Sequence, residues 1–397
     1  MGQPRIQITE LYIYPIKALR PLSVPTAQLR REGLKYDRRF MLLKVEADGQ
    51  YTNIQTASFP ECTLFSQTID GDHIVVTYQI PAVPLVSPTP EQRTPLRVPL
   101  DPEYDEHADE VPINLYGSAT TAYRVWGPYS DWFASCLGYP TVLVYIGSNR
   151  RRVLAHAPPA PPRPTKSWYA RIASRIPFTS EWPPSDDEVD EADGDDDGGL
   201  TFNEAAPFLV TSKASLRDVS ARLPPGQEMD MIKFRPNIVV DVVPDHSPPS
   251  PPSAPISGDS EGEDHPTNLT AWDEDFWSEL LIGGTHRLAL TANCARCISI
   301  NIDYGTGCPG TDESGSILKK LMRDRRVDTG NKWSPIFGRY AFLLPPTTNT
   351  TAMNGPSDSK EPYDASSLLG LVADVAVGDE VKVTRRISSR DVWAWPK

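Results

Sequence analysis

The apolar residues of this 397-residue chain occur in short runs that alternate with polar residues, and long helical repeats are rare. The segment IQITELYIYPIK alternates in this way, and FMLLKV and QYTNIQT stand on either side of Asp48–Gly49. An Asp-Gly connection between two such runs is typical of a β-hairpin. A second Asp-Gly pair at 70–71 leads into HIVVTY, and DWFASCLG is predicted to be a short helix ending on Gly138. Residues 5–147 are therefore predicted to fold as a meandering β unit with little helix.

Residues 200–391 show the same preference for short strands. A helix is predicted to begin near Ser212, because Leu216 and Val219 recur at helical spacing. Strands are predicted in FRPNIVVDVV, LLIGG, HRLALT, CISINID, YAFLL and EVKVTRR, with a further helix in SILKKLMRDRR. The sequence thus predicts a mainly β fold with some α-helix (α+β), namely a β-barrel decorated by helices rather than a doubly wound sheet.

Proline and acidic residues interrupt this pattern in two places. Forty-one prolines are about twice the usual frequency. Residues 186–197 hold nine acidic and no basic side chains, which accounts for most of the net charge of -13. We predict a mostly disordered linker at 148–199, with docking of a partner as the alternative, and a disordered insertion at 246–266. An acidic chain without a basic stripe also indicates that nucleic acid is not the partner.

The chain contains no run of about 18 apolar residues, and its first residues match neither a secretory nor a mitochondrial targeting pattern. We therefore expect no transmembrane segment. The cysteines are odd in number and are not spaced as a disulfide framework, which favours a reducing compartment and a cytoplasmic location. They are Cys62, Cys136, Cys294, Cys297 and Cys308.

The segment Cys294-Ala-Arg-Cys297 lies between two apolar runs that are predicted to be strands. A cationic neighbour such as Arg296 favours the thiolate, which is the form that binds metals. Taken alone, the pair is compatible with buried structural cysteines, a redox dithiol or metal ligation. Zinc is excluded because the six histidines are scattered and no second C-x-x-C pair is present.

Two further groups of residues could contact an anion. Arg235 and Asn237 flank a proline at the start of a predicted strand, and they offer the donors that a phosphate or a polar heterocycle needs. Structural ion pairing is an equal alternative there. Lys17 and Arg39 stand near strand ends in YPIK and YDRRF, where the alternative is a surface side chain whose stem packs on apolar neighbours.

The sequence Gly305-Thr-Gly-Cys-Pro-Gly310 fits the G-x-G-x-x-G pattern of dinucleotide-binding loops. Pro309 stiffens this turn, and no β-α-β alternation surrounds it. The chain also contains no Walker loop, G-x-S-x-G elbow or haem-attachment motif. We therefore do not expect nucleotide binding.

The segments ITELYIYPIK, YDRRFMLL, IQT, FRPNIVV, EDFWSELLIG, CARC, SPIFGRY and VGDEV occur in the order found in one known family. In this respect the chain resembles MOSC-domain proteins with an N-terminal MOSC β-barrel domain, and it is similar to the mitochondrial amidoxime reducing component group. The resemblance covers both predicted units but neither the linker nor the insertion. It implies a MOSC-type β-barrel preceded by an N-terminal β-barrel domain.

The resemblance also implies a molybdenum-molybdopterin cofactor, whose metal is bound by the second cysteine of the C-x-R-C segment. That residue is Cys297 here, which would be both metal ligand and catalytic, and Cys294 would be only a neighbour. One departure is Ala18, where the family commonly has a serine that bonds the cofactor phosphate. The matching cofactor-binding positions are Lys17, Arg39, Arg235, Asn237, Arg296 and Tyr340.

The activity implied by the resemblance is reduction of small N-hydroxylated substrates, such as amidoximes and hydroxylamines. The electrons would come from an external b-type cytochrome and its NADH-dependent reductase. Glu204 is a candidate for proton handling, with a plain surface carboxylate as the alternative.

A non-catalytic cofactor carrier related to the C-terminal domain of molybdenum cofactor sulfurase is the main rival, although no pyridoxal-dependent domain precedes the matched region. Another oxo-transfer reaction and a scaffold are further alternatives. Pyridoxal phosphate binding is also attributed to the family, and attachment to the mitochondrial outer membrane is the alternative location.

Overall fold

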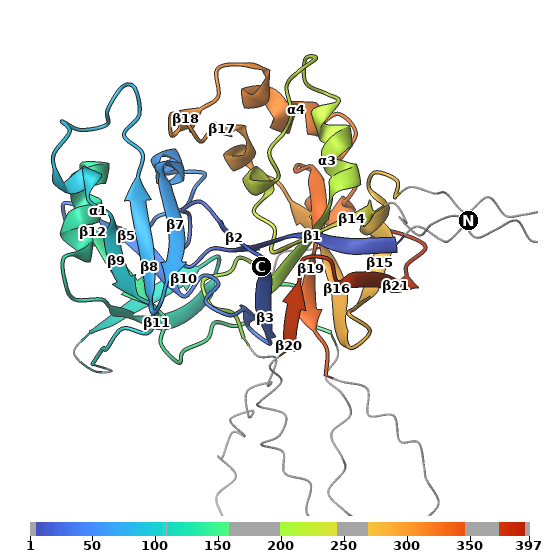
Figure 1. The fold of residues 1–397 in the computed structure, drawn as a ribbon, viewed down its shortest axis with the longest axis horizontal. Coiled ribbons are helices and arrows are strands. Elements are labelled where there is room, and N and C mark those ends of the chain that lie inside the picture. The colour runs from blue at the N-terminus through green and yellow to red at the C-terminus, as the bar shows by residue number, and fades with distance from the viewer. Residues whose placement is uncertain are drawn as a thin grey trace, which may run out of the picture.

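The computed structural model describes residues 5–105, 107, 109–158, 199–243, 269–345 and 373–393. These residues form two β units that lie side by side (Figure 1). Residues 159–198 of the predicted linker and the whole predicted insertion at 246–266 lie outside the described residues.

The larger unit is a barrel. Its seven described strands follow one another in the order β14 (Ile238–Val243), β13 (Phe208–Ser212), β19 (Ile336–Leu343), β16 (His286–Ala295), β15 (Trp277–Ile282), β21 (Glu380–Arg386) and β1 (Arg5–Ile13). Strand β1 pairs with both β21 and β14, and this double pairing closes the ring. Strands β13 and β14 are parallel, whereas the other neighbours in the ring are antiparallel. The short β2 (Leu22–Val24) also pairs with β1.

Successive side chains of the barrel strands face alternately the interior of the barrel and its outer surface. Ile238 and Val240 of β14 belong to the core inside the barrel, where Trp277 is fully buried. Val239 lies between them and belongs to a second core that includes Phe337. Successive side chains of a strand point to opposite faces, so one strand serves both cores.

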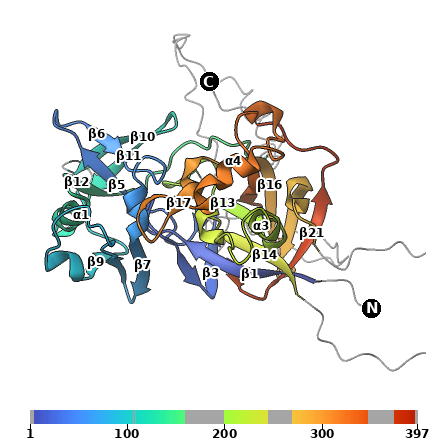
Figure 2. The same ribbon diagram turned by 90° about the horizontal axis from the view of Figure 1, so that it is seen from above.

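Helices cover this second core on the outside of the barrel. They are α3 (Lys213–Ser220) and α4 (Ile317–Leu321), and both views show them on the same side (Figure 2). The predicted helix start at Ser212 is confirmed, because its side chain accepts hydrogen bonds from the first backbone N–H groups of α3. The helix predicted over 316–326 is shorter than expected, because its C-terminal part turns inward to place the Arg325 guanidinium on buried Asp275.

The smaller unit packs a five-stranded sheet against a three-stranded sheet. The first contains β5 (Phe40–Val45), β6 (Tyr51–Asn53), β10 (Glu110–Leu115), β11 (Ser118–Arg124) and β12 (Thr141–Tyr145). The second contains β7 (Phe65–Asp70), β8 (His73–Tyr78) and β9 (Leu96–Pro99), and α1 (Tyr129–Leu137) packs on the same core. The predicted turns at Gly49 and Gly71 and the left-handed helix end at Gly138 are all confirmed by positive φ angles.

Short elements complete the described chain. The small sheets are β3 (Thr26–Arg30), β4 (Gly33–Leu34) and β20 (Ala373–Ala376), and β17 (Ile302–Asp303) with β18 (Cys308–Pro309). The 3-10 turns are η1 (Pro60–Leu64), η2 (Glu91–Arg93), η3 (Met231–Phe234), η4 (Asp273–Phe276), η5 (Ile298–Asn301), η6 (Glu313–Ser316) and η7 (Thr329–Asn331). Residues 304–307 join β17 to β18 as a hairpin, so the Gly-rich segment at 305–310 is part of a turn between paired strands.

The predicted block 5–147 supplies strands to both units. Its first strand, β1, belongs to the barrel, and β3 pairs with β20 near the C-terminal end of the described chain. The segment between β4 and β5 then crosses to the smaller unit, so residues 35–39 lie at the junction. No helix among the described residues is long and apolar enough to cross a membrane.

Candidate functional site

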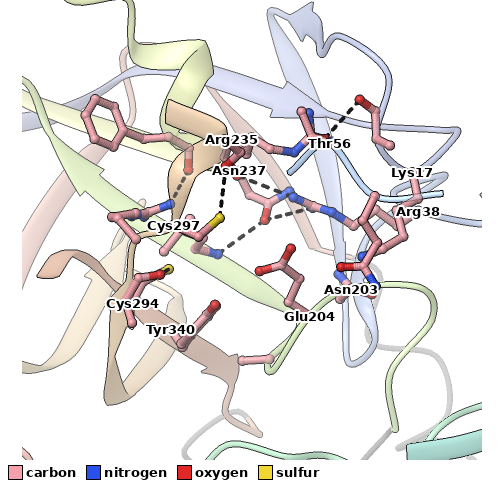
Figure 3. A pocket seen from close by; sticks show the side chains of 18 of the residues that line it. Lys17, Arg38, Thr56, Asn203, Glu204, Arg235, Asn237, Cys294, Cys297 and Tyr340 are labelled. Atoms are coloured by element: carbon pink, nitrogen blue, oxygen red, sulfur yellow. Dashed lines mark hydrogen bonds between the residues drawn. The ribbon is translucent and has the colours of Figure 1, made fainter. Parts of the chain in front are cut away.

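An open pocket lies at the junction of the two units. The barrel contributes the end of β16, part of β19 and the turn η3, and the chain before β5 and after β6 contributes the facing wall. Figure 3 shows the side chains from these segments pointing toward a common space. The polar lining residues are Lys17, Arg38, Gln55, Thr56, Asn203, Glu204, Lys233, Arg235, Asn237, Cys294, Arg296, Cys297, Ser299 and Tyr340.

The two cysteines of the C-x-x-C segment have different environments. Cys294 lies within β16, and only 2% of it is exposed. Cys297 lies just beyond the strand end, is exposed, and has its Sγ atom 3.2 Å from Ser299 Oγ. The strand predicted to follow Cys297 is mostly absent, since residues 298–301 form the turn η5 and only β17 is extended. This turn leaves the Cys297 thiol open to the pocket, whereas burial raises the pKa of the Cys294 thiol.

Arg296 holds the cysteine segment in place. Its guanidinium donates hydrogen bonds to the carbonyls of Phe337 (2.9 Å) and Phe234 (2.6 Å), and its backbone N–H donates to Pro335 O (2.8 Å). The side chain is buried and its charge therefore lies behind the pocket wall. Arg296 thus fixes the position of Cys297 and adds positive potential to the site.

Lys17 lies on the opposite wall, only 5% exposed. Its Nζ atom donates to Phe202 O at 2.9 Å, which uses one of three donors. Burial lowers the pKa of Lys17 to about 7, although Glu204 acts in the opposite direction. An anion in the pocket would stabilise the charged form, because an ammonium group with one hydrogen bond is poorly solvated there.

The structure does not place Arg39 at this pocket. The Arg39 guanidinium donates to Tyr145 OH (3.0 Å) and Gly147 O (2.6 Å), and it lines a separate depression. Arg38 lines the pocket instead and pairs with Asp37. Arg39 is directed away from this pocket because Tyr36 and Arg38 have positive φ angles of 69° and 50°. These angles break the strand-like alternation from which the direction of a side chain is inferred.

Arg235 and Asn237 both line the pocket as predicted, but their side chains also serve the protein itself. Arg235 is the C-terminal cap residue of η3, where its backbone has a φ of 53°. Its guanidinium donates a hydrogen bond to Leu19 O at 3.0 Å. The Asn237 amide donates to Tyr12 O and Asp37 at 3.2 Å each, and its oxygen accepts from Leu209 N at 3.2 Å. Asn237 therefore joins the strands of the barrel to the pocket wall, and it would have to exchange a partner to bind a ligand.

Asp37 is a buried carboxylate next to the pocket that the sequence did not indicate. It is 2% exposed and accepts hydrogen bonds from Tyr14 N (2.8 Å), Asn237 (3.2 Å) and Asn203 (3.3 Å), in addition to Arg38. A buried carboxylate with four donors fixes all of them. The only sequence signal was an acidic residue beside two arginines, which is common on protein surfaces. Asn203 and Lys233 carried no signal.

Tyr340 lies in β19 and is 6% exposed. Burial raises its pKa well above the usual range, so the phenol is protonated. Its ring meets the ring of Trp393 edge to face, with centroids 5.5 Å apart. The last described residues of the chain therefore support the pocket wall from behind.

The charges of the pocket are unbalanced. The lining includes five cationic side chains and one acidic side chain, Glu204. No group of three or more His, Cys, Asp or Glu side chains among the described residues could hold a metal ion. A metal here would have Cys297 as its protein ligand, and its other ligands would have to come from an anionic organic cofactor. The residues present fit such a cofactor, because the open thiol faces a cationic wall.

The pocket thus combines an accessible thiol with cationic side chains at the junction of a barrel and a second β unit. The MOSC N-terminal beta barrel domain matches residues 5–140, and the MOSC domain matches residues 197–258 and 263–382. The chain belongs to the MOSC-domain proteins that carry this N-terminal domain. The predicted fold class is confirmed: the protein is mainly β with few helices, with a MOSC-type barrel and an N-terminal β-barrel domain.

Curated relatives cover most of the chain at modest identity. Mitochondrial amidoxime-reducing component 1 of Homo sapiens is 26% identical over 354 residues, which are 86% of this chain and 80% of that protein. The protein of the same name from Danio rerio is 24% identical, over 84% of this chain and 79% of its own length. Molybdenum cofactor sulfurase of Neosartorya fischeri is 25% identical over 86% of this chain, which spans 38% of that longer protein.

Proposed function

We propose that the pocket binds a molybdenum-pterin cofactor through Cys297 and that the protein is a molybdenum-dependent reductase of N-hydroxylated compounds. The observation that carries the proposal is the open Cys297 thiol opposite a wall of buried cations. The relatives support it, because they are named for amidoxime reduction and for the molybdenum cofactor.

Each lining residue has a distinct part in this proposal. Lys17 and Arg38 supply the positive wall for the cofactor's phosphate, in place of the predicted Arg39. Arg235 and Asn237 hold the rim of the site, and Arg296 fixes the cysteine segment. Tyr340 offers a protonated hydroxyl beside Cys294. When bound, the cofactor supplies two-electron oxygen-transfer chemistry, whereas the protein binds and orients.

The proposed reaction takes an amidoxime or a hydroxylamine to the corresponding amidine or amine. The N–O bond is broken, two electrons and two protons are consumed, and the oxygen leaves as water. The electrons come from outside the chain, and we propose a b-type cytochrome with its NADH-dependent reductase as the donor. Pyridoxal phosphate has no part in this proposal.

Metal analysis of two variants tests the site. Molybdenum per chain and oxidised-pterin fluorescence are measured on protein made in a cofactor-competent host. Wild type is expected to carry near-stoichiometric metal and to reduce benzamidoxime with a chemical donor, and Cys297→Ala to lose metal, activity or both. Cys308→Ala is the matched control, because Cys308 is also exposed but does not line the pocket. Folded wild type without metal or pterin would contradict the proposal.

A cofactor carrier is the second candidate, because a molybdenum cofactor sulfurase matches the same share of the chain at similar identity. The two functions differ in one readout. A carrier loaded with cofactor reduces no N-hydroxylated compound but activates a cofactor-free molybdenum enzyme on mixing. A reductase turns over benzamidoxime, and its cofactor stays bound through the same mixing step.

The proposed location is the cytoplasm, with attachment to the mitochondrial outer membrane as the alternative, since the relatives are named as mitochondrial. Fractionation of cells that express the tagged full chain separates the two. Recovery with the mitochondria after a high-salt wash would favour the alternative, and recovery in the supernatant would favour the cytoplasm.

A further inference from the structure

Glu204 is held in the pocket by an anchored backbone. The N–H of Phe202 donates to Arg38 O (3.0 Å), and the carbonyl of Ala205 accepts from Ala155 N (3.0 Å). The neighbouring Asn203 is 1% exposed and donates to Asp37 and to Pro207 O. Glu204 itself is exposed, because its side chain projects into the open space of the pocket (Figure 3).

The carboxylate of Glu204 has almost no protein partners, although cations surround it. No ion pair of Glu204 is found within the described part of the chain, and its one described hydrogen bond is a long one of 3.5 Å from Tyr116 OH. That hydroxyl lies closer to Gln55, at 2.9 Å. One donor of Lys17 and the guanidinium of Arg296 are directed to backbone carbonyls instead. The carboxylate is therefore available to a ligand.

The electrostatics of the pocket keep this group ionised. Surrounding protein would by itself raise the pKa of Glu204, but Lys17, Arg38, Arg235 and Arg296 together lower it. An ionised carboxylate accepts up to about four hydrogen bonds, and it is costly to leave without donors in a concave site. In this charge state the carboxylate is an acceptor for the N–H groups of a ligand.

We propose that Glu204 forms a substrate-binding subsite for ligands that present neighbouring N–H donors, the amidoxime and amidine class. An amidoxime carries an NH₂ group beside its N–OH group, and an amidinium ion presents two parallel N–H donors to one carboxylate. This arrangement matches the bidentate pairing of a guanidinium with a carboxylate. Ligands without such donors, for example aromatic N-oxides, gain nothing from Glu204. The inference rests on the proposed function and adds the residue that recognises this class of substrate.

Binding of benzamidine to the cofactor-loaded full chain tests the subsite by calorimetry. Wild type is expected to bind benzamidine, and Glu204→Gln to bind it about 10-fold or more weakly, because a charge-assisted pair is lost. Glu204→Asp keeps the charge and is expected to recover part of the affinity. Glu313→Gln is the control, because Glu313 is an exposed carboxylate outside the pocket. Molybdenum content is expected to be the same in all four proteins.

Kinetics supply a second readout. For Glu204→Gln, KM for benzamidoxime is expected to rise much more than kcat falls, and KM for an aromatic N-oxide to stay unchanged. Equal benzamidine affinity in wild type and Glu204→Gln overturns the inference, and so does loss of molybdenum from the variant, which would assign Glu204 to cofactor retention. Benzamidine binding does not require turnover. A wild type that binds benzamidine but reduces no N-hydroxylated compound therefore contradicts the proposed function and leaves the subsite intact.

Discussion

Replacement of Asp37 by alanine is expected to destabilise the junction of the two units strongly. The carboxylate of Asp37 is buried and pairs with the guanidinium of Arg38, whose side chain is only 10% exposed. Its other donors are Tyr14 N and the amides of Asn203 and Asn237. Removal of one partner of a buried ion pair costs about 3–5 kcal/mol, because the remaining charge is left without compensation.

Thermal unfolding of cofactor-free protein measures this effect. A bound cofactor would add stability by mass action, so the proteins should come from a host that does not make it. At about 2–4 °C per kcal/mol for a domain of this size, Asp37→Ala is expected to lower the midpoint by roughly 6 °C or more. Asp37→Asn should be intermediate, since one oxygen remains as an acceptor.

Asp72→Ala is the matched control for this experiment. Its side chain is 90% exposed and pairs only with the neighbouring His73 among the described residues, so its loss should change stability by less than about 0.5 kcal/mol. If Asp37→Ala unfolds within about 2 °C of wild type, the assignment of Asp37 as the organiser of the pocket wall is wrong.

Three other substitutions have expected outcomes. Burial lowers the pKa of Lys17 to about 7 from its usual 10.5, so between these values the unfolded chain binds more protons and stability rises with pH. Lys17→Met should flatten this rise when thermal midpoints of cofactor-free protein at about pH 7 and about pH 9 are compared. Burial raises the pKa of Glu274 to about 8 from its usual 4.5, so stability falls as pH rises through that window. Glu274→Gln should remove that contribution when thermal midpoints at about pH 5 and about pH 8 are compared, and a fall of unchanged size would disprove it. Gly338 has φ at 79°, and a Cβ atom there would lie 2.7 Å from Val210 O. Gly338→Ala should therefore cost about 2 kcal/mol or more in denaturant unfolding and reduce molybdenum content, and a stable, fully loaded variant would refute this.

Local signals were sufficient for much of the secondary structure. The Asp-Gly turns, the cap at Ser212 and the helix end at Gly138 depend on one or two residues and on short-range hydrogen bonds. The apolar run that begins at Ile298 was mistaken for a strand, because short apolar runs do not distinguish strands from turns and buried helix segments.

Residues of the pocket could be predicted from the sequence only where the type of residue itself indicated a chemical role. The structure brings Lys17, Arg235 and Arg296 to the same pocket as Cys297, and it also brings Asn237 and Tyr340 there. Whether they bind a cofactor stays a prediction. Arg38 and Asp37 were not predicted, because the positive φ angles of Tyr36 and Arg38 decide which arginine faces the pocket. Backbone angles of this kind depend on the junction between the units, which has no local signature in the sequence.

Closure of the barrel by β1 has a consequence for the synthesis of the protein. This strand leaves the ribosome before the other strands of the barrel, and its partner β14 follows roughly 225 residues later and β21 later still. At about 5–20 residues per second, the strand waits roughly 10–45 s before it can pair with β14. During that time its apolar side chains, Ile8 and Leu11 among them, have no barrel to enter. The smaller unit can fold while the nascent chain is still growing, whereas the barrel is completed only when the last strand has been made and the first one returns to it.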